Sequence, residues 1–220
     1  MATSRSYHDA CGMAHALDLV GERWALLVLR ELVLGPKRYT DLRADLPGIS
    51  TNVLANRLEE LERTGVLRRR RLPPPAGSSV YELTDWGRQL EPIMCDLGRW
   101  GARSPDRPED AHLSITSCVL SLRTNFAPQA ARGVRLCLEI VLGEDRFHAR
   151  VDDGRFEITP GGVEAPDAVV ESDPVTLASV LYGGRSLADA TRSGALSVRG
   201  EKAAVARFLS LFLLPEPAAV

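Results

Sequence analysis

Two helix-sized segments joined by a three-residue turn constrain this chain more than any other feature. Tyr39–Leu46 and Ser50–Thr64 each carry apolar residues at helical spacing, and Pro47-Gly48-Ile49 connects them. The proline and glycine end the first helix and force a tight turn, as a helix-turn-helix motif requires. Two further helix candidates, Met13–Val20 and Glu22–Leu34, precede this motif.

A predicted β-hairpin follows the motif. Val66–Leu72 and Ser79–Leu83 are strand-sized runs on either side of the proline-rich loop 73–77, and Thr84–Trp100 is predicted as a helix with Thr84 as its N-cap. The order helix, helix, short helix, turn, helix, strand, loop, strand predicts a winged helix-turn-helix domain over residues 1–103.

The second helix of the motif has two distinct faces. At 100° per residue, Leu54, Leu58 and Leu61 fall within about 60° of one another and form an inward stripe. Asn52 and Asn56 lie opposite, one turn apart near the helix start, where a recognition helix meets base edges and an amide pairs with adenine. The alternative is that these amides belong to an ordinary solvated face.

The start and flank of the same helix suit phosphate better than bases. Ser50 and Thr51 bring hydroxyls and free N–H groups to the helix start, which favours a phosphate contact. Arg57 lies on the flank, where it is better placed for a phosphate than for a base edge.

The predicted hairpin is rich in arginine. Arg63 and Arg68 to Arg71 give five positive charges, and no acidic residue occurs between Arg63 and Tyr81. Alternate strand residues face opposite sides, so about half of Arg68–Arg71 can face one partner. The remainder would be solvated or paired with the upstream acidic residues Glu59, Glu60 and Glu62. Beside a helix-turn-helix, this run favours phosphate binding over a merely solvated strand.

The total charge hides this local excess. The whole chain carries 27 basic and 29 acidic side chains, but residues 1–105 hold 15 and 13, and residues 106–220 hold 12 and 16. The change of sign coincides with the proline-rich, acidic stretch 104–112, which is predicted as a linker. We therefore expect a second domain over residues 113–215.

Composition excludes several classes of protein. Hydrophobic residues at 45% and charged residues at 25% are typical of a soluble globular protein, and no apolar run approaches the length of a membrane span. The four cysteines are far apart, which argues against a disulfide framework or a zinc ribbon. A cytoplasmic protein without a membrane partner is expected.

The second half predicts an α+β domain. Strands are expected at 133–141, 147–151, 155–159, 168–171 and 196–198, and helices at 174–181, 186–193 and 202–214. Asp152-Asp153-Gly154 between two strands is a hairpin signal.

Several stretches between residues 7 and 101 match one known family: Cys11, Ala14–Trp24, Leu29–Leu32, Gly35–Tyr39, Leu46–Ser50, Leu54, Arg57-Leu58, Leu61, Gly65–Leu67, Tyr81–Gly87 and Trp100-Gly101. In these stretches the chain resembles the HxlR-type winged helix-turn-helix transcription regulators. The resemblance implies a homodimer built from the first and last helices of the domain, bound to a near-palindromic operator in double-stranded DNA.

Matching the family's recognition elements residue by residue gives the candidate DNA-binding set: Tyr39, Thr40, Ser50, Thr51, Asn52, Asn56, Arg57, Arg68, Arg70 and Arg71. Cys11 falls where the family has an N-terminal cysteine that senses oxidants or electrophiles in some members. This makes Cys11 a candidate redox sensor, although a cysteine before an apolar helix is also commonly packed.

The second half resembles another fold. Its matching residues are Gly154, Ala165–Ala168, Gly183-Gly184, Ala188–Ala190, Ser193–Val198, Gly200, Ala203–Leu209 and Leu211-Phe212. They resemble the sterol-carrier-protein-2-like fold, which encloses an apolar cavity between a sheet and its helices. The expected fold class is therefore α+β, with an N-terminal winged helix-turn-helix domain and a C-terminal sterol-carrier-like domain.

Such a cavity would take an apolar small molecule. Its expected lining is Leu177, Val180, Leu181, Leu187, Leu196, Phe208, Leu211 and Phe212. The alternative is that these side chains form a closed core.

No enzymatic site is evident. The chain has no phosphate-binding glycine loop, nucleophile elbow or metal-spaced histidine pair, so no catalytic residue, metal or cofactor is expected. The sequence favours a transcription regulator. The two resemblances imply repression, the commoner direction in the HxlR-type family, and control by an apolar ligand bound in the C-terminal domain. The alternative function is an apolar-ligand carrier whose N-terminal domain mainly dimerises.

Overall fold

The computed structural model describes residues 6–75, 77–106 and 111–219. The chain divides into two compact units, residues 1–94 and 95–220, called here the N-terminal and C-terminal units. The predicted linker 104–112 includes residues 107–110, which lie outside the described residues. The predicted domain boundaries at residues 103 and 113 therefore stay predictions.

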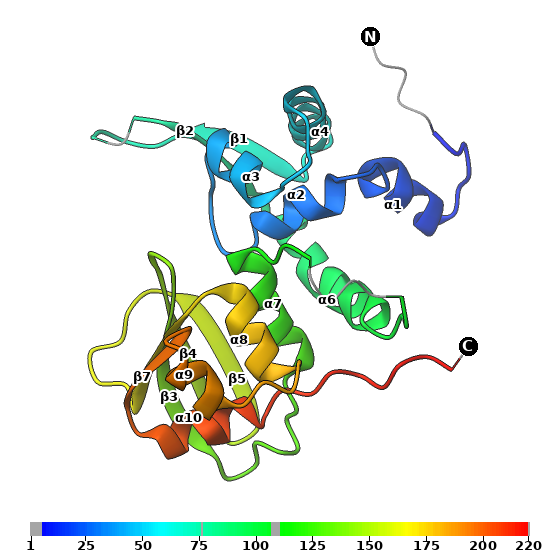
Figure 1. The fold of residues 1–220 in the computed structure, drawn as a ribbon. Coiled ribbons are helices and arrows are strands. Elements are labelled where there is room, and N and C mark those ends of the chain that lie inside the picture. Colours follow the sequence, from blue (N-terminus) through cyan, green and yellow to red (C-terminus); the bar gives the residue numbers. More distant parts are fainter. Residues whose placement is uncertain (1–5, 76, 107–110, 220) are drawn as a thin grey trace. The chain divides into compact units, whose positions relative to one another are not determined.

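The N-terminal unit has the predicted order of elements. They are α1 (Gly12–Val20), α2 (Ala25–Glu31), α3 (Tyr39–Asp45), α4 (Thr51–Arg63), β1 (Leu67–Arg71), β2 (Ser79–Leu83) and α5 (Asp85–Arg88), and α6 (Leu90–Gly101) runs across the division between the units. Figure 1 shows α3 and α4 packed close together, with the hairpin β1–β2 extending away from the helices. This arrangement is a winged helix-turn-helix.

The helix bounds predicted from the sequence are wrong for two helices. The helix expected at Glu22–Leu34 begins only at Ala25, because Trp24 adopts a left-handed conformation with φ 79°. The helix expected at Thr84–Trp100 is two helices, α5 and α6. Pro92 has no N–H to donate to the carbonyl of Arg88, and its ring would crowd that carbonyl in a continuous helix.

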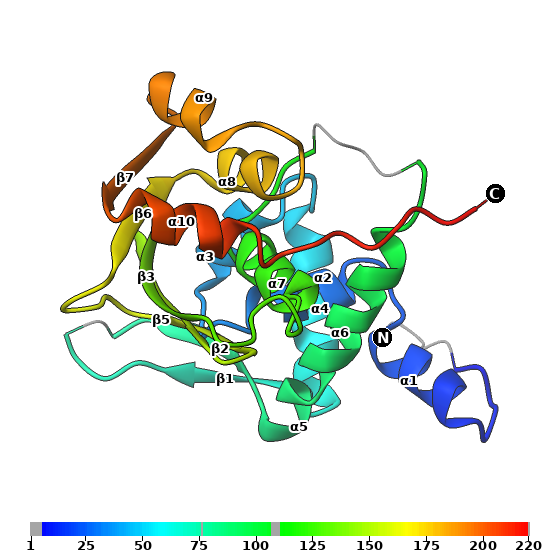
Figure 2. The same cartoon turned by 90° about the horizontal axis from the view of Figure 1, so that it is seen from below.

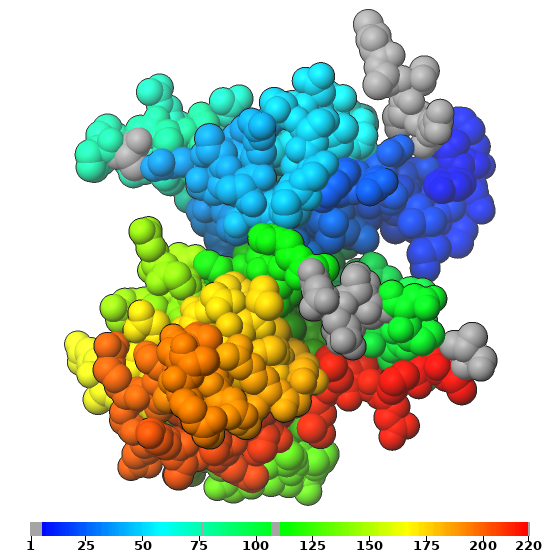
Figure 3. All heavy atoms as spheres, in the orientation of Figure 1, coloured from blue at the N-terminus to red at the C-terminus, as the bar shows by residue number. Residues whose placement is uncertain are grey.

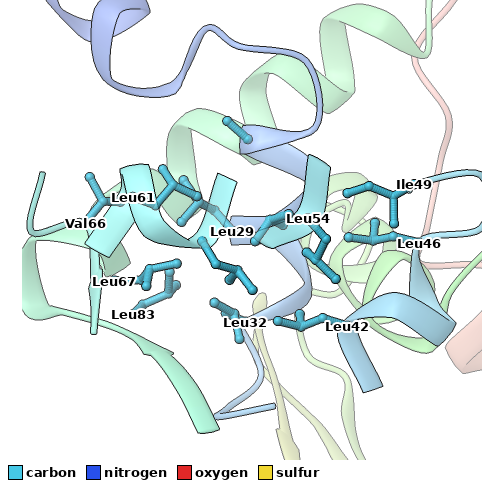
Figure 4. Close-up of a cluster of buried hydrophobic side chains, with 13 residues drawn as sticks. Leu29, Leu32, Leu42, Leu46, Ile49, Leu54, Leu61, Val66, Leu67 and Leu83 are labelled. Atoms are coloured by element: carbon cyan, nitrogen blue, oxygen red, sulfur yellow. The ribbon is translucent and has the colours of Figure 1, made fainter. Parts of the chain in front are cut away.

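The leucine stripe of α4 lies at the centre of the N-terminal unit. Leu54, Leu58 and Leu61 are fully buried, as the helical wheel predicted. Figure 4 shows buried side chains from α2, α3, α4 and the hairpin converging in one cluster. Its other members are Ala25, Val28, Leu29, Leu32, Leu42, Leu46, Ile49, Val66, Leu67 and Leu83. This core fixes which face of α4 is left for solvent.

The C-terminal unit contains a five-stranded sheet. Its elements are α7 (Ile115–Asn125), β3 (Arg135–Leu142), β4 (Asp145–Asp152), β5 (Arg155–Pro160), β6 (Ala168–Ser172), α8 (Pro174–Leu181), α9 (Leu187–Arg192), β7 (Leu196–Gly200) and α10 (Lys202–Leu209). The strand order is β5-β4-β3-β6-β7, and only β3 and β6 pair in parallel. In Figures 1 and 2, α7, α8 and α10 cover one face of this sheet.

Most of this unit follows the sequence prediction, with two differences. Helix α7 was not predicted; Ser114 caps its start, and seven of its residues are buried. The last helix ends at Leu209 instead of Leu214. After it, Phe212 forms a bridge with Phe126, which replaces the helical continuation with an extended turn. The predicted α+β character of the second half is confirmed.

A buried ion network joins α2 to the start of the motif. The side chain of Glu31 is 0% exposed and bonds to Arg30 Nη2 at 2.7 Å and to Lys37 Nζ at 3.0 Å. Lys37 Nζ also lies 2.6 Å from Asp45 Oδ2 at the end of α3, and its backbone forms a bridge with Tyr81 of β2. One buried carboxylate therefore connects α2, through Lys37, to α3 and the hairpin.

Glu31→Gln is expected to lower the free energy of unfolding of the N-terminal unit by about 2–3 kcal/mol, because it removes the charge that compensates two partly buried cations. Urea unfolding followed by tryptophan fluorescence measures this, since two of the three tryptophans, Trp24 and Trp86, belong to the N-terminal unit. Glu59→Gln, on the exposed face of α4, is the matched control and should change little. Equal effects of the two variants would contradict the structural role of Glu31.

Candidate nucleic-acid interface

Helices α3 and α4 are fixed to each other at their N-terminal ends. The hydroxyl of Tyr39, the first residue of α3, donates a hydrogen bond to the carbonyl of Thr51 at 2.8 Å. Gly48 in the connecting turn has φ 90°, a conformation that glycine adopts without strain. The half-buried Tyr39 ring and the buried Leu42 and Leu46 hold the turn against α4. Tyr39 therefore positions α4, and Thr40 beside it is exposed.

The exposed face at the start of α4 carries most of the predicted contact residues. Ser50 is the N-cap, and its Oγ accepts a hydrogen bond from the backbone N–H of Val53 at 3.3 Å. Thr51, Asn52 and Asn56 are exposed. None of these three side chains has a hydrogen bond among those of the described residues, so the two amides are available to an external partner.

Arg57 differs from the other predicted contacts. Its side chain is only 15% exposed, and Nη1 lies 2.5 Å from Glu60 Oε2 and 3.7 Å from Glu22 Oε2. Glu22 is distant in sequence, which is why helix geometry alone could not identify it as a partner. Arg57 links the segment between α1 and α2 to α4, and a phosphate contact from it requires competition with two carboxylates.

The hairpin divides its four arginines between two faces. The register pairs Arg68 with Glu82 and Arg70 with Val80, which places these side chains on one face of the ribbon. Arg69 and Arg71 lie on the other face, where the Arg69 guanidinium stands 5.9 Å from the Tyr81 ring centroid. In the space-filling view the hairpin projects from the rest of its unit (Figure 3).

Glu82 holds the two arginines of the first face. Its side chain is 9% exposed, with Oε1 at 2.7 Å from Arg68 Nη2 and Oε2 at 2.6 Å from Arg70 Nε. From the sequence we expected Glu59, Glu60 or Glu62 to pair with arginines of the hairpin. The observed partner is Glu82, which lies one residue beyond the stretch without acidic residues from Arg63 to Tyr81. No carboxylate among the described residues forms an ion pair with Arg69 or Arg71, although Arg71 Nε donates to the carbonyl of Gly77 at 3.0 Å.

The ion pairs also shift the titration of Glu82. A hydrogen bond from Arg70, reinforced by Arg68, lowers the pKa of Glu82 below its ordinary value despite its burial. The ionised carboxylate is therefore part of the folded hairpin at neutral pH.

Cys11 is an exposed thiol immediately before α1. The backbone N–H groups of Ala14 and Met13, in the first turn of the helix, lower its pKa. These properties suit a reactive thiol better than a packed one, and the role of Cys11 as a redox sensor stays a prediction.

The predicted ligand residues lie inside the C-terminal unit. Leu177, Leu196, Phe208, Leu211 and Phe212 are fully buried, and Val180, Leu181 and Leu187 are half-buried. Phe208 and Phe212 pack against Phe156, with ring centroids 6.0 and 5.2 Å away. These contacts favour the closed core, and the ligand role of the eight residues stays a prediction.

Two absences hold for the described part of the chain. No group of three or more His, Cys, Asp or Glu side chains there is arranged to hold a metal ion. None of its helices combines the length and apolar character that crossing a membrane demands.

Known proteins match the N-terminal part of the chain. The family model for the HxlR-like helix-turn-helix matches residues 19–109. The "Uncharacterized HTH-type transcriptional regulator YvaP" of Bacillus subtilis (strain 168) is 38% identical over 85 residues, which are 39% of this chain and 79% of that protein. The "HTH-type transcriptional regulator YodB" of the same organism is 35% identical over 88 residues, 40% of this chain and 79% of that protein.

A solved structure also resembles this part. The oxidised form of the redox regulator HypR is 31% identical and covers 44% of this chain and 100% of its own, with a TM-score of 0.41. The sequence relatives alone establish the family: the chain belongs to the HxlR-like helix-turn-helix family. These relatives are transcription regulators and not enzymes. The similarity of the C-terminal unit to the sterol-carrier fold stays a prediction.

Glu82→Gln is expected to destabilise the N-terminal unit at neutral pH and to lose this effect in acid. Because the pKa of Glu82 is lowered in the folded state, its contribution is fully present above the unfolded pKa of about 4.3 and disappears as the pH falls through the lower folded value. Urea unfolding of both proteins between about pH 7 and pH 3 measures the difference. A difference that stays constant to the lowest pH would contradict the ion pairs.

Proposed function

We propose that this protein is a DNA-binding transcription regulator that acts as a homodimer and represses its target genes. The exposed polar face at the start of α4, held outward by a buried leucine stripe, carries this proposal. In this proposal the exposed Asn52 and Asn56 read base edges, and the exposed Ser50 and Thr51 contact phosphates. The relatives' descriptions as HTH-type transcriptional regulators support the same function.

The hairpin supplies the second part of the interface. Arg68, Arg70 and Arg71 are the proposed phosphate contacts, and Arg69 adds a fourth exposed cation. Glu82 offsets one of these four charges, so the ribbon keeps a net charge of about three for the DNA backbone. Glu82 also orders Arg68 and Arg70, which reduces the entropy lost when they bind phosphate.

A homodimer accounts for the apolar surfaces of α1 and α6. Neither helix buries any residue in the single chain. Ile93, Leu97 and Trp100 are spaced by four and three residues along α6, so they share one face, and the Trp100 side chain is 74% exposed. Met13 and Leu17 are similarly exposed on α1. A second copy of the chain would cover these faces and present two recognition helices to a near-palindromic operator.

Control by a small molecule completes the proposal. An effector bound by the C-terminal unit would favour one spacing of the two recognition helices over another, and would thereby change the affinity for the operator. Repression is proposed because it is the commoner direction of regulation in the family. The apolar ligand and its eight core residues remain the prediction from sequence. The competing function, an apolar-ligand carrier, requires no affinity for DNA.

Asn52→Ala with Asn56→Ala is expected to lower affinity for the operator at least about tenfold, because it removes both base-reading amides. The operator is obtained first, by capturing sheared DNA from the protein's own genome on the immobilised protein and sequencing what is retained. Fluorescence anisotropy with a retained duplex then measures affinity.

Arg155→Ala, which removes an exposed cation of the C-terminal unit, is the control and should leave affinity unchanged. Enrichment of no sequence in the capture step would favour the carrier. Equal affinity of the Asn double variant and the native protein would contradict the proposed recognition face.

Leu97→Glu is expected to convert the dimer to a monomer, because it places a charge in the proposed apolar interface. Light scattering coupled to size-exclusion chromatography measures the mass. Leu213→Glu, at an exposed leucine outside α1 and α6, is the control and should leave the mass unchanged. A native protein that elutes as a monomer of 24.0 kDa would contradict the dimer directly.

A further inference from the structure

A depression of about 420 Å³ lies beside the start of α4, next to the proposed base-reading face. Three parts of the N-terminal unit line it: the segment before α2, the turn between α3 and α4, and the first two turns of α4. The lining includes Glu22, Arg23, Trp24, Gly48, Ser50 and Arg57. The sequence predicted DNA contacts from α3, α4 and the hairpin, and none from the segment before α2.

Two side chains hold the segment before α2 against α4 and its turn. Glu22 Oε2 lies 3.7 Å from Arg57 Nη1. The Trp24 ring packs against the buried core and lies beside the turn, where a Cβ added at Gly48 would stand 3.9 Å from the ring. Trp24 has φ 79°, a left-handed conformation that persists in a residue with a side chain only where packing enforces it. Arg23, between these two anchors, is therefore fixed beside the start of α4.

Arg23 is the uncompensated cation of the depression. Arg57 Nη1 is paired with Glu60 Oε2 at 2.5 Å, and Glu22, the carboxylate of the lining, is turned toward the same Arg57. Among the described residues, no carboxylate forms an ion pair with Arg23, whose side chain is exposed. Its guanidinium lies 5.8 Å from the centroid of the Trp24 ring, a contact that orients a cation without neutralising it.

The start of α4 adds donors on the same side. The hydroxyl of Ser50, which also lines the depression, accepts a hydrogen bond from the N–H of Val53. The N–H groups of the residues between them have no acceptor within the helix, because they belong to its first turn. Together with Arg23 they provide a cation and backbone donors, the combination that phosphate oxygens accept from proteins.

The position of this depression fits the geometry of a helix in the major groove. Such a helix has one sugar-phosphate backbone along each edge of the groove. Figure 1 shows the hairpin on one side of α4 and the segment that joins α1 to α2 on the other. The hairpin arginines face one flank of α4. On the other flank Arg57 is neutralised by its carboxylates, so Arg23 is the cation left to meet the second backbone.

We infer that Arg23 contacts a backbone phosphate of the bound DNA, on the flank of α4 away from the hairpin. Its guanidinium would donate to two oxygens of one phosphate beside the start of α4. Arg57 would keep its carboxylate partners and act as the positioning residue of the segment. The inference rests on the proposed function, because it requires a DNA-binding protein, and it adds a contact from outside the helix-turn-helix and the hairpin.

Arg23→Gln is expected to weaken binding to the captured operator and to an unrelated duplex of the same length by a similar factor, at least about fivefold, because a phosphate contact carries no sequence information. The slope of log Kd against log salt should become shallower by about one for each bound subunit. Fluorescence anisotropy with the full chain, between about 50 and 200 mM potassium chloride, measures both quantities.

Two variants serve as controls. Arg23→Lys keeps the charge, so the native slope should return while the affinity recovers in part. Arg88→Gln removes an arginine of α5 that does not line the depression, and it should leave slope and affinity unchanged. Circular dichroism should show the same folded state for all variants, because both arginines lie at the surface.

A native slope in Arg23→Gln, or a loss confined to the operator, would overturn the inference, and so would a Lys variant with the slope of the Gln variant. In each of these cases the native protein still binds DNA, so the proposed function would stand without this contact. Absence of DNA binding by the native protein would overturn the proposed function, and the inference with it.

Discussion

The burial of one leucine stripe determines which face of α4 the N-terminal unit exposes to solvent. Leu54, Leu58 and Leu61 fill the space between α2, α3 and the hairpin, and each leucine of this kind stabilises the fold by about 2–3 kcal/mol when fully buried. Rotation of α4 about its axis would expose this stripe. The opposite face, with Asn52 and Asn56, is therefore held toward solvent by the core, without contacts of its own.

Two buried carboxylates add ion pairs to the apolar contacts of the core. Glu31 and Glu82 are both nearly inaccessible carboxylates, and each holds two cations. Glu31 connects α2 to α3 and the hairpin through Lys37, and Glu82 orders one face of the hairpin. The positive charge of the ribbon is thus arranged in two sets: Arg68 and Arg70 are fixed, and Arg69 and Arg71 have no carboxylate partner among the described residues.

Sequence patterns predicted the motif well because its signals are local. Periodicity and the Pro47-Gly48 turn placed α3 and α4 within one residue of their observed ends. The break at Gln89, ahead of Pro92, was missed because the surrounding residues favour a helix. Helix α7 was missed because its apolar residues are too evenly spread for a clear periodic pattern. The partners Glu22 and Glu82 come from elsewhere in the chain, so no pattern around Arg57 or Arg68 could identify them.

The start of α4 and the hairpin together form the proposed DNA-contacting surface. Photo-cross-linking of the protein to its captured operator, with the attachment sites mapped by peptide mass spectrometry, tests this most directly. Attachment is expected within residues 39–57 and 68–71. Attachment confined to the C-terminal unit, or to the face of α4 that carries Leu54 and Leu58, would contradict it.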